Sequence, residues 1–161
     1  MARDRPRIAR NIAPTPPVAD FLVTASLQQH DGIAMRRILN PAGIARPASA
    51  YHHAVVVERP ARELYMSGQL GERADGSISS DFTEQARQIW INIKAILAEG
   101  SMGVGDIVKV TSYIVGRENI PAYVAVHRDE VGEHLPPWTL VLVAGLGSPR
   151  YLVEVEAIAA Q

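Results

Sequence analysis

The sequence predicts an α+β domain in which two helices cover one face of a β-sheet, with the element order β-β-α-β-α-β-β. Five runs are rich in β-branched and aromatic residues at strand lengths, and two segments repeat apolar residues at helical spacing. The chain has 161 residues, of which 47% are hydrophobic and 20% are charged, and these values are typical of one soluble globular domain.

The N-terminal segment differs from the rest of the chain. Residues 1–34 show no sustained helical or strand period, and three prolines in "APTPPVAD" interrupt either structure. We therefore expect residues 1–35 to form a flexible extension without catalytic function and residues 36–161 to form a single domain. Two alternatives stay open: the Arg-rich start resembles a transit peptide without its cleavage pattern, and Met35 is a second candidate start.

The first expected elements are two strands. "YHHAVVVE" (51–58) and "ELYMSGQL" (63–70) are β-rich runs separated by "RPAR", a pattern that indicates a hairpin. "GERADGSIS" (71–79) then reads as a polar, glycine-containing loop.

The first helix is expected within residues 81–100. Asp81 and Glu84 form a capping-box pattern at its start, and Gly100 is a plausible C′ residue at its end. The apolar residues recur at helical spacing and give the helix one face to bury. They are Phe82, Ala86, Ile89, Ile93, Ile96 and Leu97.

The remaining elements are three strands and a second helix. Strands are expected over 106–116, 138–145 and 151–159, and a helix is expected over roughly 119–131. "GSMGVGD" (100–106) follows a helix instead of opening one, so it reads as a connection and not as a dinucleotide-binding loop. The second helix carries an apolar stripe. Its members are Ile120, Tyr123, Val124, His127 and Val131.

The last strand has one apolar face and one mixed face. Tyr151, Val153, Val155, Ala157 and Ala159 alternate with Leu152, Glu154, Glu156 and Ile158. Because helices cover only one face of the sheet, we expect the face with the glutamates to meet a neighbouring subunit or a pocket, and one glutamate to have a polar partner. A solvated sheet face is the equally weighted alternative.

Composition narrows the function classes. Residues 38–161 carry ten basic and fourteen acidic residues, and this net negative charge disfavours nonspecific nucleic-acid binding. No apolar run approaches the roughly 20 residues of a membrane span, so no membrane partner is expected. The absence of cysteine removes disulfides and thiolate chemistry and suits a cytoplasmic location.

Other candidate residues have plain structural interpretations. His52 and His53 point to opposite sides of a strand and cannot chelate one ion together, and no other metal-ligand spacing is present, so no metal site is expected. Ser67 has no His–Asp pair at motif spacing, and His127 on its apolar stripe is expected to be a hydrogen-bonded structural histidine.

Several stretches together resemble the Rid (YjgF) family of reactive-intermediate deaminases. They are residues 40–57, 64–71, 85–114, 136–146 and 152–159, and together they span nearly all of residues 36–160. The resemblance implies a chorismate-mutase-like two-layer sandwich, a homotrimer with ligand pockets between subunits, and hydrolysis of small reactive enamines and imines to keto acids and ammonia. It implies no metal and no organic cofactor.

The resemblance also assigns site residues. Tyr51, in "SAYHHAV", corresponds to the family's pocket tyrosine, and Ser67 and Gly68, in "SGQ", correspond to a turn that meets the ligand. Glu154, the first glutamate of "VEVEAIA", corresponds to the carboxylate that positions the hydrolytic water. A carboxylate is suited to orient and partly deprotonate water that attacks a C=N carbon.

The sequence departs from the family where the substrate carboxylate is bound. The family's arginine after the prolines is replaced by Trp138, and the following serine is replaced by Thr139. The family's cysteine and asparagine positions correspond to Leu140 and Val124. An indole offers one N–H and no charge, so loss of the arginine should weaken imino-acid binding by on the order of a hundredfold.

Two function hypotheses follow. The first is an imine or enamine hydrolase in which Glu154 activates water, and Trp138 and Thr139 contact a substrate that needs no arginine clamp. The second is a noncatalytic trimeric protein that binds or senses a small molecule. Arg150 or Arg128 is a candidate replacement for the missing charge. Ribonuclease activity, also attributed to this family, is disfavoured by the acidic domain.

Overall fold

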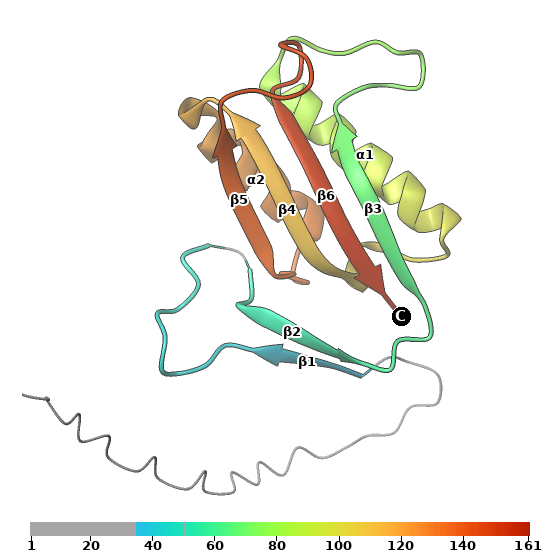
Figure 1. The fold of residues 1–161 in the computed structure, drawn as a ribbon, viewed down its shortest axis with the longest axis vertical. Coiled ribbons are helices and arrows are strands. Elements are labelled where there is room, and N and C mark those ends of the chain that lie inside the picture. The colour runs from blue at the N-terminus through green and yellow to red at the C-terminus, as the bar shows by residue number, and fades with distance from the viewer. Residues whose placement is uncertain (1–34, 50) are drawn as a thin grey trace, which may run out of the picture. The chain divides into compact units, whose positions relative to one another are not determined.

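A computed structural model describes residues 35–49 and 51–161 of the protein. Four strands form one sheet in the order β3-β6-β4-β5 (Figure 1). They are β3 (Glu63–Leu70), β4 (Ile107–Val115), β5 (Trp138–Val143) and β6 (Val153–Ala160). The pairs β3–β6 and β4–β6 are antiparallel, whereas β4 and β5 are parallel. A parallel pair needs a crossover connection, and the second helix provides it.

Two helices pack on one face of this sheet (Figure 1). They are α1 (Phe82–Glu99) and α2 (Ile120–Val131), which confirms the predicted α+β class with two helices on a single face. The core between the layers contains side chains with almost no exposed surface. Its largest members are Trp90, Tyr123, Ile89, Ile93, Leu97, Ile107 and Ile114.

The ends of α1 lie where the sequence indicates. The Asp81 carboxylate accepts a hydrogen bond of 2.9 Å from the backbone N–H of Glu84, which is one half of the predicted capping box. The other half is not formed, because the Asp81 N–H donates to Ser79 Oγ at 3.1 Å. Gly100 follows the last helical residue, but the left-handed residue is Ser101, with φ of 54°. A Cβ at Gly100 would lie 2.5 Å from Leu64 Cδ1, so glycine is needed there for close packing and not for its backbone angles.

The predicted hairpin of residues 51–58 with 63–70 is wrong. β2 (Ala54–Glu58) pairs with β1 (Met35–Leu39), and β3 pairs with β6 instead. The "RPAR" segment therefore passes from one sheet to the other, and Arg59 adopts a φ of 48° where the chain turns. The segment predicted to be an extension, 1–34, lies outside the described residues.

The β1–β2 pair is held to the base of the larger sheet by one side chain. Arg36 donates to Asp106 Oδ1 at 2.9 Å, and it also donates to the carbonyl oxygens of Gly105 and Ala160. These contacts join β1 to the short 3-10 helix Val104–Asp106 that precedes β4 and to the end of β6. The connection predicted for residues 100–106 is confirmed.

The two sheet faces differ as the last strand predicts. Val153, Val155, Ala157 and Ala159 are buried beneath the helices. Neither helix covers the other face, called here the open face. Its residues follow from the strand registers. They are Tyr65, Lys109, Thr111, Tyr113, Thr139, Val141, Glu154, Glu156 and Ile158. Among the described residues, no helix is long and apolar enough to cross a membrane.

Candidate functional site

Ser67, Gly68 and Glu154 come together on the open face. The β3–β6 register shifts between Met66 and Gln69, so Ser67 and Gly68 form a bulge beside β6. A Cβ built on Gly68 would lie 1.8 Å from Glu154 Oε1. The Glu154 carboxylate therefore lies directly against the backbone of Gly68, and only glycine leaves room for it.

Glu154 has free hydrogen-bonding capacity. No side-chain hydrogen bond or ion pair engages its carboxylate within residues 35–49 and 51–161, whereas Glu156 accepts a 3.2 Å bond from the Tyr113 hydroxyl. Tyr113 is also the cross-strand partner of Glu154. Burial, followed by the charge of Glu156, raises the pKa of Tyr113, so its phenol remains protonated at neutral pH. Both oxygens of Glu154 are thus left to accept hydrogen bonds, for example from a water molecule.

Thr139 lies on the same face as Glu154 and contacts a lysine. Lys109 Nζ donates a 2.6 Å hydrogen bond to Thr139 Oγ1. Burial lowers the pKa of Lys109, and the negative charge of Glu156 partly opposes this effect. Thr139 therefore belongs to a polar row on the open face, in which it pairs with Thr111 of β4 and Thr111 pairs with Glu156 of β6.

Trp138 lies on the opposite, helix-covered face of the sheet. Its ring stacks on His127 with centroids 4.0 Å apart and an interplanar angle of 21°. Its Nε1–H donates to Ser112 Oγ at 3.0 Å, and Ser112 pairs with the Tyr123 hydroxyl at 2.7 Å. The single N–H of the indole is therefore already used within the chain, although the residue keeps part of its surface exposed.

His127 is fully buried and lacks the hydrogen bonds that were predicted for it. Neither Nδ1 nor Nε2 has a partner among the described residues, and the ring lies among Trp90, Tyr123 and Trp138. Burial lowers its pKa to about 4. The expectation of a hydrogen-bonded structural histidine was wrong, because aromatic rings and not polar groups surround it.

Tyr51 lies in the segment that leads into β2. Its hydroxyl accepts a 3.4 Å hydrogen bond from the backbone N–H of Ala48. The next residue, His52, donates its backbone N–H to the carbonyl oxygen of Leu135, three residues before β5. The segment that contains Tyr51 is thus hydrogen-bonded to the loop that leads into β5 and Trp138. Glu154 lies in β6, which is separated from β5 by β4.

The site residues predicted from sequence therefore form two groups. Ser67, Gly68 and Glu154 meet on the open face, whereas Trp138 lies beneath the sheet and Tyr51 belongs to the loop before β2. One copy of the chain brings only the first group together.

Neither candidate replacement arginine contacts these groups. The side chains of Arg128 and Arg150 make no hydrogen bond or ion pair in the described part of the chain. Arg150 bonds through its backbone alone: its carbonyl oxygen accepts from Gln85 Nε2 at 2.9 Å and its N–H donates to Ser148 Oγ at 3.3 Å. Sequence reasoning missed Lys109 and Tyr113 as neighbours of the glutamates. Their alternation in "DIVKVTSYIVG", which places both on the face opposite Val110, was the available signal.

The comparisons with known proteins agree with this geometry. The sequence model of the family described as "Endoribonuclease L-PSP" matches residues 43–161. The chain is 30% identical to RutC family protein UK114 of Drosophila melanogaster over 78% of this chain and 89% of that protein. It is 31% identical to 2-iminobutanoate/2-iminopropanoate deaminase of Capra hircus over 79% and 91%.

A solved structure shares the fold. It is a protein of unknown function from the conserved Rid protein family, YyfB of Yersinia pestis. The TM-score is 0.70 at 27% identity, and the match covers 78% of this chain and 98% of that one. The residues matched by the family model, 43–161, include the bulge in β3 and the strand β6, which carries the two glutamates.

Proposed function

This chain belongs to the family described as Endoribonuclease L-PSP, which includes the Rid (YjgF) proteins, and from this membership we propose that it is a hydrolytic deaminase of a reactive imine or enamine. The observation that carries the proposal is the Glu154 carboxylate, which lies against Gly68 on an uncovered sheet face without a hydrogen-bonding partner in the described residues. The deaminase of Capra hircus, at 31% identity, supports the same class of reaction.

The proposed reaction uses Glu154 twice. The substrate enters as a protonated imine, and the Glu154 carboxylate accepts a proton from water as the water oxygen bonds to the C=N carbon, which gives a neutral carbinolamine. The protonated carboxyl then gives this proton to the amino nitrogen, the C–N bond breaks as ammonia leaves, and the hydroxyl passes its proton to the departing ammonia, so that a carbonyl product and ammonium are formed. The cycle consumes one water and needs no cofactor.

The complete pocket is proposed to form between copies in a homotrimer. Glu154, Ser67 and Gly68 of one copy would meet Tyr51, Thr139 and Trp138 of the next. Within one copy Trp138 lies on the helix-covered face and Tyr51 lies in the segment before β2, while Thr139 shares the open face with Glu154 but lies across β4 from it. The open face, with the apolar residues Val141 and Ile158, is the surface that a neighbour would cover.

Substrate recognition is proposed to differ from that of the arginine-containing members. Trp138 offers no positive charge, and its N–H is bonded to Ser112. A substrate with a planar or less acidic group is therefore favoured over a 2-imino acid, for which a bidentate guanidinium supplies the strongest contact. Trp138 would provide one apolar wall and Thr139 a hydroxyl.

The test measures ammonia release from enzymatically generated 2-aminoacrylate and from an uncharged imine. Substitution Glu154→Gln keeps the size of the side chain and removes the base, so activity should fall about a hundredfold or more. Glu63→Gln is the matched control, because Glu63 lies at the start of β3 and, among the described residues, its carboxylate accepts a side-chain hydrogen bond only from Tyr65. Equal activity of the wild type and Glu154→Gln would remove Glu154 from the mechanism.

The second candidate is a noncatalytic trimeric protein that binds a small molecule. The observation in its favour is the position of Trp138, whose ring and N–H are both occupied within the chain. Under this alternative the wild type releases no ammonia from any imine, and Glu154→Gln changes nothing. Activity that appears only in Trp138→Arg would indicate that the pocket has been adapted to another ligand.

A further inference from the structure

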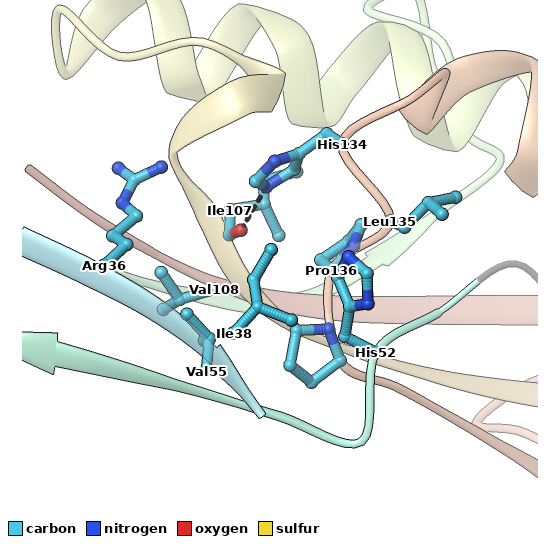
Figure 2. Close-up of a pocket in the computed structure, with 10 residues that line it drawn as sticks. Arg36, Ile38, His52, Val55, Ile107, Val108, His134, Leu135 and Pro136 are labelled. Carbon is cyan, nitrogen blue, oxygen red and sulfur yellow. Dashed lines mark hydrogen bonds between the residues drawn. The ribbon is translucent and has the colours of Figure 1, made fainter. Parts of the chain in front are cut away.

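A cavity of about 160 Å³ lies apart from the proposed catalytic residues. Figure 2 shows residues from four segments around it: Arg36 and Ile38 from β1, Val55 from β2, residues at the start of β4, and the loop before β5. Most of its wall is aliphatic or proline, including Ile38, Val55 and Pro136. None of the six residues assigned to the reaction lines it, so it needs a separate explanation.

The hydrogen bonds of Asn40 determine the tautomer of His52, which lines the cavity. The backbone N–H of His53 donates to Asn40 Oδ1 at 3.0 Å, so this amide oxygen is the acceptor. Asn40 Nδ2 therefore donates to His52 Nδ1, also at 3.0 Å. In its neutral form His52 must then carry its proton on Nε2, which is left as a free hydrogen-bond donor.

His134, which also lines the cavity, has the complementary arrangement. Its Nε2 is 2.6 Å from the carbonyl oxygen of Ile107, and because a carbonyl only accepts, Nε2 carries the proton. In the neutral ring Nδ1 is then a free acceptor. One unused donor and one unused acceptor thus belong to two imidazoles in the lining of a cavity whose wall is otherwise aliphatic or proline, apart from Arg36.

The charge at this cavity is already neutralised within the chain. Arg36 pairs with Asp106 at 2.9 Å and donates to two backbone carbonyls. Its guanidinium is therefore not available to bind an external carboxylate or phosphate. A charged ligand would lose hydration without gaining an opposite charge, which disfavours both anions and cations.

We propose that this cavity is a second ligand site, which binds a small uncharged molecule with a compact apolar body and one group that both accepts and donates a hydrogen bond, such as a primary amide. The amide oxygen accepts from His52 Nε2–H, and its N–H donates to His134 Nδ1. A cavity of about 150 Å³ is large enough for a benzene ring, so a ligand of about nine non-hydrogen atoms suits the volume found here.

The experiment titrates the full-length protein with benzamide and with benzoate, its isosteric anion. The readout is the ¹⁵N chemical shift of the imidazole nitrogens of His52 and His134. Benzamide should shift both rings in a saturable manner with a Kd of roughly millimolar, as nine atoms and two hydrogen bonds allow. Benzoate should bind at least about tenfold more weakly, because the buried charge finds no partner.

A cavity-filling pair of variants tests the location. Val55→Phe adds a ring inside the cavity and should abolish the benzamide shifts, whereas Val56→Phe, on the other face of the same strand, should leave the Kd within about twofold. The proposal is overturned if benzamide leaves both imidazoles unshifted, if benzoate binds equally well, or if Val55→Phe binds as the wild type does. The comparison of amide with anion uses only the wild type, so it decides the question even where Val55→Phe does not fold.

Discussion

At the scale of single residues, the burial of His127 beneath Trp138 makes the free energy of unfolding depend on pH. His127 has no exposed surface, no hydrogen-bond partner among the described residues, and aromatic rings on three sides. The free-energy cost of burying its imidazole is low only for the neutral form, because loss of hydration destabilises the charged form. The pKa of about 4 in the folded state lies well below the value of roughly 6.5 in an unfolded chain.

Folding stability should therefore fall as the pH drops from about 6.5 to 4. Within this window the unfolded chain binds a proton at His127 and the folded chain does not, so protonation favours unfolding. The loss is at most about 3 kcal/mol, from 1.36 kcal/mol per pKa unit. Substitution His127→Phe keeps an aromatic ring and removes the proton site, so urea unfolding at pH 4.5 and 7 should differ less than in the wild type.

Another histidine provides the control for this prediction. His53 is partly exposed and donates to the carbonyl oxygen of Ala45, and His53→Gln should retain the acid sensitivity of the wild type. If His127→Phe lost stability toward acid as steeply as the wild type, the buried imidazole would not be the source of the effect.

At the scale of secondary-structure elements, the bulge in β3 joins the sheet geometry to the chemistry. Because β3 has one extra residue here, Ser67 and Gly68 together oppose a single residue of β6. The Glu154 carboxylate occupies the space that a side chain at position 68 would fill. The bulge therefore leaves the space beside β6 in which the carboxylate lies.

Substitution Gly68→Ala should move the carboxylate with little effect on the fold. The new Cβ would lie 1.8 Å from Glu154 Oε1, but the clash involves the end of a flexible side chain that can rotate away. We expect ammonia release to fall about a hundredfold, the scale on which a misplacement of about 1 Å acts, while urea unfolding changes little. Gly145→Ala is the control, because nothing lies within 4 Å of its added Cβ. Unchanged turnover in Gly68→Ala would mean that the position of the carboxylate is unimportant.

The sequence predicted most elements because the periods of α1, β4 and β6 are clear. β6 alternates strictly, so its covered face and its glutamate face could be assigned without a structure. β5 is apolar on both faces, so its pattern could not place Trp138 above or below the sheet. The partner of β2 was missed because strand pairing depends on contacts that are distant in sequence, and β1 lies next to a segment without a pattern.

At the scale of the whole molecule, the open face is a sheet surface that neither helix covers. It combines apolar residues such as Val141 and Ile158 with a polar row of Lys109, Thr139 and Glu156. Helices cover the other face completely enough to bury Val153 and Val155. A surface of this composition fits an association in which neighbouring copies cover the open faces.

Substitution Val141→Asp should dissociate the proposed trimer. Val141 pairs with Tyr113, which pairs with Glu154, so the new carboxylate would add negative charge to this row, and burying it in each interface would cost several kcal/mol. Light scattering coupled to gel filtration should give a trimer for the wild type and a monomer for the variant. Ile91→Asp is the matched control, because Ile91 is 59% exposed on α1, away from this face. A monomeric wild type would contradict the shared pocket.

The separation of Tyr51 from Glu154 within one chain has a genetic consequence in the proposed trimer. Each copy contributes Glu154, Ser67 and Gly68 to the pocket that it shares with one neighbour. It contributes Tyr51, Thr139 and Trp138 to the pocket that it shares with the other neighbour. A copy with a defective Glu154 still offers a sound Tyr51, and the reverse holds for a copy with a defective Tyr51. In a cell that makes equal amounts of two such inactive chains, random assembly leaves about one quarter of the pockets with two sound halves. Two recessive alleles could thus restore part of the activity that each one lacks alone.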